Sequence, residues 1–126
     1  LGPMCGNFGH FMVYAPGDKV ETRDYGVARY GMEVQRLLSV LDQHLEGRTY
    51  LVGEEFTIAD MASFPWVNQL LNGYKHPSGI DANSFLTVSK YNNVLAWAER
   101  IRERPAVQRG LVVCTNGQGK PWLANE

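Results

Sequence analysis

Few of the side chains that perform chemistry in enzymes stand at productive spacings in this chain. The three histidines, His10, His44 and His76, are scattered, and none lies in a metal-binding pattern such as H-E-x-x-H. The cysteines Cys5 and Cys114 have no C-x-x-C partner, and no G-x-S-x-G nucleophile elbow occurs. Glycine-rich phosphate-binding patterns are also absent from the sequence. We therefore predict no metal site and no catalytic residue within the chain.

One acidic residue, Asp60, stands at the start of an apolar helical segment, where it would serve either as a general base or as a cap. Its position three residues after Thr57 favours capping, because Thr57 is a good N-cap and Asp60 can accept the backbone N–H of Thr57. Phe56 and Met61 flank this capping box at the spacing of a hydrophobic staple. The sequence predicts structural roles for Thr57 and Asp60.

Two further features are candidates for ligand binding. Arg29 precedes Tyr30 near the start of a long helix, where an arginine is usually solvated but, at the edge of a cleft, can bind a carboxylate through paired hydrogen bonds. Aromatic rings cluster within the first helix, which indicates core packing or, beside a glycine-containing helix, an apolar pocket: Phe8, His10, Phe11 and Tyr14. Spacing alone leaves both interpretations open.

Helical periodicity organises most of the chain around these residues. A short helix is predicted before Pro16, followed by a long amphipathic helix over 22–45 that Thr22 or Asp24 would cap and Gly47 would end. Two glycines in the first half of the long helix indicate close approach of another backbone, or a bend: Gly26 and Gly31.

The second half of the chain predicts a central helix over 58–72 that is apolar on every side and therefore buried, with Pro65 causing a kink near 62–64. A fourth helix runs from 89 or 90 to 103, and Pro105 starts a short fifth one. Loops are predicted over 46–56, 73–88 and 111–126, the last with a flexible Gly117–Lys120 segment. With no alternating segments, the prediction is an all-α bundle of about five helices forming one domain over 1–126.

Composition excludes several classes of protein. A net charge of −1 and a pI near 6.3, with no basic stripe, argue against a nucleic-acid partner. No apolar run is long enough to span a membrane, and no signal-peptide pattern opens the chain. The cysteines lie far apart in sequence, so free thiols in a reducing, cytoplasmic location are expected.

Several motifs carry a family resemblance. Residues 50–60, Y-L-V-G-E-E-F-T-I-A-D, and residues 103–107, E-R-P-A-V, resemble the helical C-terminal domain of cytosolic glutathione transferases. The first two helices are similar to those of the nu-class and related glutathione-dependent disulfide-bond reductases, through G-P-M at 2–4, G-H-F at 9–11, Y-A-P at 14–16 and Y-G-M-E-V-Q-R-L-L at 30–38.

The resemblance implies a two-domain enzyme. A thioredoxin-like N-terminal domain, absent from this chain, would bind and activate glutathione as a substrate, and the helical domain would form the wall for a small electrophile or disulfide. Arg29 would contact glutathione, Thr57 and Asp60 would be structural, and five residues would line the adjacent pocket: Phe8, His10, Phe11, Tyr14 and Tyr30. The parent enzyme would be a homodimer, and this chain, as a fragment, would have little or no activity alone.

Two alternatives keep the same fold. Transferase-like helical domains also mediate assembly in translation factors and synthetase complexes, although this chain lacks the long charged linker or basic appendix that such proteins often add. A chaperone-like or regulatory derivative that has lost catalysis is the other alternative, and the sequence does not separate it from an enzyme domain.

Overall fold

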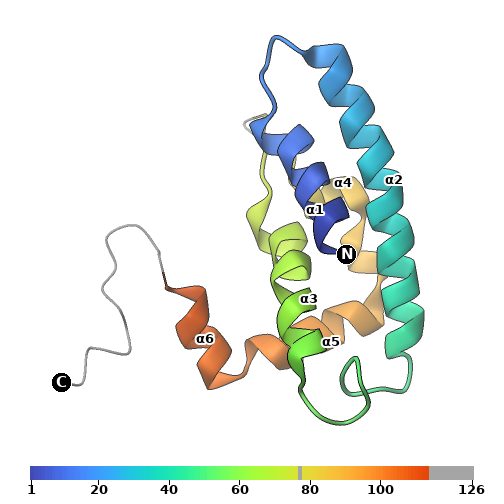
Figure 1. The fold of residues 1–126 in the computed structure, drawn as a ribbon, viewed down its shortest axis with the longest axis vertical. Coiled ribbons are helices and arrows are strands. Elements are labelled where there is room, and N and C mark those ends of the chain that lie inside the picture. Colours follow the sequence, from blue (N-terminus) through green and yellow to red (C-terminus); the bar gives the residue numbers. More distant parts are fainter. Residues whose placement is uncertain (77, 114–126) are drawn as a thin grey trace, which may run out of the picture.

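A computed structural model of the chain describes residues 1–76 and 78–113, and these residues form helices joined by turns (Figure 1). The prediction of an all-α fold is confirmed, with six α-helices and no β-strand in the described ranges. In chain order they are α1 (Gly2–Gly9), α2 (Val20–Leu45), α3 (Ile58–Asn68), α4 (Ala82–Leu86), α5 (Asn92–Arg102) and α6 (Pro105–Leu111). Wider π-helical turns extend α1 over His10–Tyr14 and α3 over Gln69–Gly73, and a short 3₁₀ turn over Val88–Lys90 precedes α5.

The helix α1 lies between α2 and α3, and contacts both (Figure 1). Helix α5 crosses the lower end of this layer against α2 and α3, and α6 extends from α5 to one side. The core fills the space that these helices enclose, and its largest fully buried side chains are Trp97, Phe8, Leu38, Leu70, Leu86 and Ile101.

The long helix α2 begins earlier than predicted. It starts at Val20, so Thr22 and Asp24 lie within the helix and the capping prediction for them is wrong. Lys19 precedes the helix without a side-chain cap, and because this end of α2 is exposed, water can satisfy its first N–H groups. The other end agrees with the prediction, since Gly47 follows the helix with a φ of 69°.

The two glycines within α2 mark close contacts with aromatic side chains, and not the approach of another backbone that the sequence predicted. A Cβ atom on Gly26 would lie 2.4 Å from the ring of Phe11. A Cβ atom on Gly31 would lie 3.3 Å from the ring of Phe85. The glycines therefore let α1 and the chain after α3 pack tightly against α2.

The central helix is not buried on every side. Asp60, Phe64 and Val67 face the core, whereas Ile58 and Met61 are 82% and 54% exposed. The α-helix also ends at Asn68 and not at 72, because the chain widens into the π-helical turn, in which the Tyr74 N–H donates to the Gln69 carbonyl at 2.9 Å. The kink predicted from Pro65 stays a prediction.

The predicted capping box at the start of α3 is present. The Thr57 N–H donates to Asp60 Oδ2 at 2.9 Å, and the Ala59 N–H donates to Thr57 Oγ1 at 3.3 Å. Two further donors reach the same carboxylate from other segments: the Leu51 N–H, at 3.0 Å from Oδ1, and the Trp97 indole N–H, at 2.8 Å from Oδ1. Asp60 thus joins the loop before α3, the start of α3 and the middle of α5.

The Asp60 side chain is fully buried, which by itself raises its pKa. The hydrogen bonds from the Leu51 and Thr57 backbones, the Trp97 indole and the Thr57 hydroxyl outweigh this effect and hold the pKa of Asp60 below its ordinary value. The carboxylate is therefore ionised at neutral pH, and its negative charge is stabilised from within the protein.

A second carboxylate caps a helix across the fold. The first turn of α5 has no side-chain cap of its own. Asp42 on α2 instead accepts the backbone N–H groups of Asn93 and Val94 at 2.9 and 3.0 Å. Helix α5 consequently starts at Asn92, slightly later than predicted, where it meets α2.

Local capping also explains a helix that the sequence did not predict. Residues 73–88 were expected to be irregular, but Asp81 accepts the Ser84 N–H at 2.7 Å and starts α4 within them. The connection over 46–56 is a loop, as predicted, and Tyr50 and Leu51 pack against the core.

Two remaining sequence features can be placed. Cys5 is a free, buried cysteine, whereas Cys114 and the segment Gly117–Lys120 lie outside the described residues. Of the helices that the structure describes, none combines the length and the apolar character needed to cross a membrane.

Replacing Asp60 with alanine is expected to lower the free energy of unfolding by about 3 kcal/mol, because donors from three segments lose an ionised acceptor inside the protein. Urea denaturation followed by far-ultraviolet circular dichroism measures this loss. The matched control is Thr57→Ala, which removes one cap and should cost about 1 kcal/mol. A loss for Asp60→Ala no larger than the loss for Thr57→Ala would contradict the role of Asp60 as a shared acceptor.

The stability of the fold is also expected to fall in acid because of Asp60. Its pKa is lower in the folded than in the unfolded chain, so its contribution is fully present above the unfolded value of about 3.9. That contribution is lost as the pH falls further, toward and through the folded pKa. Urea midpoints measured from neutral pH down to this range should show a smaller acid-induced decrease in Asp60→Asn than in the unchanged chain, and equal decreases would argue against the prediction.

Candidate functional site

The structure divides the residues predicted to form a ligand pocket among three places. His10, Phe11 and Tyr30 lie together on one side of α2, Phe8 lies in the core, and Tyr14 lines a hollow against α3. This division follows from the helical path of residues 8–14, because neighbouring side chains on a helix point in different directions.

A row of three rings forms where the π-helical turn after α1 meets α2. The His10 and Phe11 rings meet edge to face with centroids 5.3 Å apart, and Phe11 stacks on Tyr30 at 5.6 Å. The close approach of Phe11 depends on Gly26, whose missing side chain leaves room for the ring.

Arg29 precedes Tyr30 on α2, and its side chain is exposed. Its positive charge lowers the pKa of Glu33, but the hydrogen bond from Arg36 is the larger cause of that shift. Arg36 donates to Glu33 from Nε at 3.0 Å. No hydrogen bond or salt bridge to Arg29 is found among the described residues, so its guanidinium is available to an anion from outside.

Phe8 contributes to the core and not to an open surface. Its side chain is fully buried, and its ring centroid lies 5.8 Å from that of Phe85. Because Phe8 is fully buried, a ligand at the surface cannot contact it, and Phe8 can affect a pocket only through the side chains that pack on it.

Tyr14 opens onto a hollow of about 340 Å³ between the end of α1 and the helix α3. Tyr14 itself is 69% exposed. Four residues that the sequence analysis did not select complete the lining: Pro65, Trp66, Gln69 and Tyr74. Three aromatic side chains and one amide thus surround a space within the size range of small-molecule sites.

Glycines on α1 position two of these rings. A Cβ atom on Gly2 would lie 2.9 Å from the Trp66 indole nitrogen, and one on Gly9 would lie 2.3 Å from the Tyr74 ring. Gly6, between them, would bring a Cβ atom to 3.5 Å from Trp66, an ordinary contact. The spacing of these glycines at 2, 6 and 9 along one helical face is the signal that could have indicated ring packing here.

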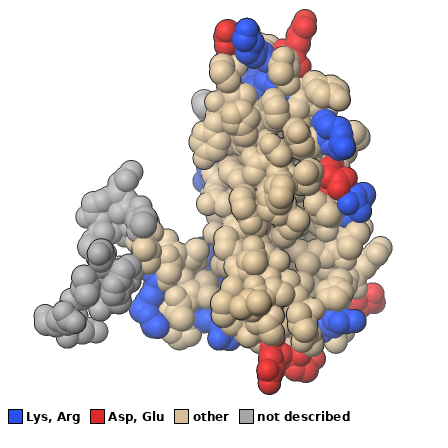
Figure 2. Space-filling model, in the orientation of Figure 1, with Lys and Arg blue, Asp and Glu red and all other residues tan. Residues whose placement is uncertain are grey.

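The hollow has little electrostatic character. Burial raises the pKa of Tyr74, so its phenol stays protonated and can donate a hydrogen bond. Figure 2 shows that the face formed by α1 and α3 has few charged side chains, which gather instead at the edges and ends of the molecule. The arrangement suits an apolar or sulfur-containing group that packs against rings and meets a few polar contacts.

The described residues offer no obvious group to activate a substrate in this hollow. Burial raises the pKa of the Cys5 thiol to about 11, which keeps it protonated and unreactive at neutral pH. No cluster of three or more potential metal ligands occurs in the ranges that the structure describes. The site can bind and orient, and the chemistry would have to come from another group.

Comparison with known proteins finds a match over residues 27–105 to the family described as "Glutathione S-transferase, C-terminal domain". The chain is 45% identical over 113 residues to "Disulfide-bond oxidoreductase YghU" of Escherichia coli (strain K12), covering 89% of this chain and 36% of that protein. It is 38% identical over 112 residues to "Disulfide-bond oxidoreductase YfcG" of the same organism, covering 89% of this chain and 45% of that protein.

A solved structure agrees with these matches. A glutathione transferase from Burkholderia graminis superposes with a TM-score of 0.80 at 37% identity, covering 92% of this chain and 45% of that one. That structure holds two glutathione molecules per subunit. This chain therefore spans less than half the length of each of the three proteins compared.

The packing of Tyr74 on α1 gives a test of how the hollow is built. Gly9→Ala is expected to destabilise the chain by about 1–3 kcal/mol, since the new methyl group would overlap the Tyr74 ring. Gly6→Ala is the matched control on the same face, and should stabilise the helix by up to about 1 kcal/mol because alanine favours helices and the space allows it. Thermal unfolding of both variants measures the difference, and equal effects would show that Tyr74 does not rest on Gly9.

Proposed function

Because the chain belongs to the glutathione S-transferase family as its C-terminal helical domain, we propose that it forms the second-substrate wall of a glutathione-dependent disulfide reductase or transferase. The observation that carries the proposal is the uncharged, aromatic hollow lined by Tyr14, Trp66, Gln69 and Tyr74. Glutathione is a substrate in this proposal, and a thioredoxin-like domain outside this chain supplies the group that activates its thiol.

The proposed reaction is thiol–disulfide exchange. The thiolate of glutathione attacks one sulfur of a disulfide, a mixed disulfide forms, and the other sulfur leaves as a thiolate that takes up a proton. The rings of the hollow would hold the disulfide away from water, and the Gln69 amide and tyrosine hydroxyls would orient its polar ends. In this proposal the helical domain binds the disulfide and does not supply the thiolate. The raised pKa of its own buried Cys5 is consistent with that role.

Arg29 is proposed to bind a carboxylate of glutathione. Its exposure and the lack of a hydrogen-bonded partner in the described part of the chain support this role, as does the planar guanidinium, which pairs with carboxylates through two parallel hydrogen bonds. The row formed by His10, Phe11 and Tyr30 includes the residue that follows Arg29 in sequence, and it would pack against the peptide of the ligand.

The remaining surface supports further proposals about the whole protein. The exposed apolar residues Ile58 and Met61 on α3 would lie under the thioredoxin-like domain, and Tyr25 and Met32, exposed two turns apart on α2, would lie in a homodimer contact. We also propose a cytoplasmic location, where glutathione is kept reduced.

A non-catalytic assembly domain is the second candidate function. The same exposed residues on α3 favour it, because exposed apolar side chains can bind another protein as well as another domain of their own protein. A longer natural protein that carries this domain but shows no glutathione-dependent disulfide reduction would support assembly and contradict the enzyme proposal.

The role of Arg29 is tested in the protein that carries both domains. Arg29→Ala is expected to raise the KM for glutathione about tenfold with a smaller change in kcat, because one charge-assisted contact to the substrate is lost. Steady-state reduction of a small disulfide measures both constants. Arg36→Ala is the matched control on the same helix, since Arg36 is already paired with Glu33. Equal kinetics for the two variants would remove Arg29 from the glutathione site.

A further inference from the structure

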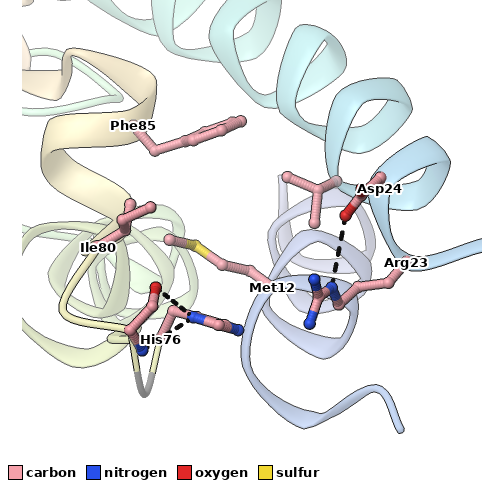
Figure 3. A pocket seen from close by; sticks show the side chains of 8 residues that line it. Met12, Arg23, Asp24, His76, Ile80 and Phe85 are labelled. Atoms are coloured by element: carbon pink, nitrogen blue, oxygen red, sulfur yellow. Dashed lines mark hydrogen bonds and ion pairs between the residues drawn. The ribbon is translucent and has the colours of Figure 1, made fainter. Parts of the chain in front are cut away.

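A second hollow lies on the other side of the π-helical turn formed by His10–Tyr14. It shares no lining residue with the Tyr14 hollow. It has a volume of about 300 Å³ and opens between this turn, the first turns of α2 and the connection that leads into α4 (Figure 3). Its lining consists of Met12, Arg23, Asp24, Val27, His76, Ser78, Ile80 and Phe85.

One part of this hollow is apolar. Met12 is buried at its base, and Val27 lies on the α2 wall. Ile80 and Phe85 are unusually exposed for their size, and both border the hollow from the opposite wall (Figure 3). A ligand with an aromatic or branched body would cover these side chains and remove them from water.

Another part of the hollow presents Arg23. The Arg23 side chain is 25% exposed, and its Nε lies 3.5 Å from an oxygen of Asp24. Asp24 is far more exposed than Arg23, so water weakens this pair. The two terminal guanidinium nitrogens have no hydrogen bond among the described residues, and they can donate together to a carboxylate.

His76 supplies a second donor. The Ser78 N–H donates to His76 Nδ1 at 3.0 Å, and the Ser78 hydroxyl lies 2.6 Å from the same nitrogen. Because Nδ1 accepts the backbone hydrogen, the proton of the neutral ring is placed on Nε2, which is then a donor. In Figure 3 the ring extends from its loop toward the side of the hollow where Arg23 lies.

We propose that this hollow binds a small organic carboxylate that has one negative charge and an aromatic or branched apolar body. The carboxylate would accept hydrogen bonds from Arg23 and His76, and the body would pack on Met12, Val27, Ile80 and Phe85. A single negative charge fits best, because Asp24 offsets part of the Arg23 charge and would repel a phosphate or a dicarboxylate. The site lies apart from the Tyr14 hollow, so its occupancy does not depend on glutathione or on the proposed function.

The test is an amide-detected NMR titration of the isotope-labelled chain with phenylbutyrate and with its neutral counterpart phenylbutanol. Phenylbutyrate is expected to shift the amide signals of Asp24, Val27, Ser78 and Ile80, and to bind about tenfold more tightly than phenylbutanol because of the charge-assisted hydrogen bonds. Equal affinities of the two compounds, no binding of either, or shifts centred on Trp66 and Gln69 would each overturn the proposal.

Three variants distinguish binding in this hollow from a general attraction of anions to the cations of the protein. Arg23→Gln is expected to remove the preference for phenylbutyrate, whereas Arg36→Gln, which changes a cation on the same helix that is paired with Glu33, should keep it. Val27→Trp should weaken binding of both compounds by filling the hollow. Melting temperatures identify any variant that does not fold. The affinities of the unchanged chain for the two compounds test the carboxylate preference without any variant. An unchanged preference in folded Arg23→Gln would contradict the proposal.

Discussion

The arrangement of the helices depends on one buried carboxylate. Asp60 accepts hydrogen bonds from the loop before α3, from the first residues of α3 and from the indole of α5. Burying a negative charge is costly unless it is hydrogen-bonded, and these donors keep the group ionised within the core. Because the same oxygens serve all three segments, the start of α3 is fixed relative to α5, and the position of α3 then determines where Trp66 and Gln69 lie.

Asp42 on α2 also binds α5, at the first turn of that helix. It caps the first turn of α5 from α2, so α5 is held at its start by one helix and in its middle by Asp60. Helix α1 is held by close packing and not by a carboxylate, since it lies between α2 and α3 with little room for side chains. Glycines on α1 and α2 provide this room, and the rings of Trp66, Tyr74 and Phe11 occupy it.

The π-helical turn after α1 separates two possible binding sites. Tyr14 faces the hollow beside α3, while Met12 faces the hollow beside the first turns of α2. The first hollow is aromatic and uncharged, which suits a second substrate whose reaction partner is activated elsewhere. The second combines apolar walls with Arg23 and His76, which suits a carboxylate. Residues that are adjacent in sequence therefore belong to different surfaces with different chemistry.

The sequence by itself determined the features that depend on neighbours along the chain. The capping box of Thr57 and Asp60, the Gly47 end of α2, the Pro105 start of α6 and the all-α class all follow from signals that act within a helical turn or two.

Only the tertiary structure showed that Trp97 and Leu51 share the Asp60 carboxylate, that Asp42 caps α5, and that one face of α3 is exposed. It also separated Phe8 from Tyr14 and placed Arg23 and His76 in the lining of one hollow. The physical reason is distance along the chain: Asp60 and Trp97 are 37 residues apart, and Asp42 and Asn93 are 51 apart. Such pairs meet only when the core packs, and no local pattern of residues specifies them.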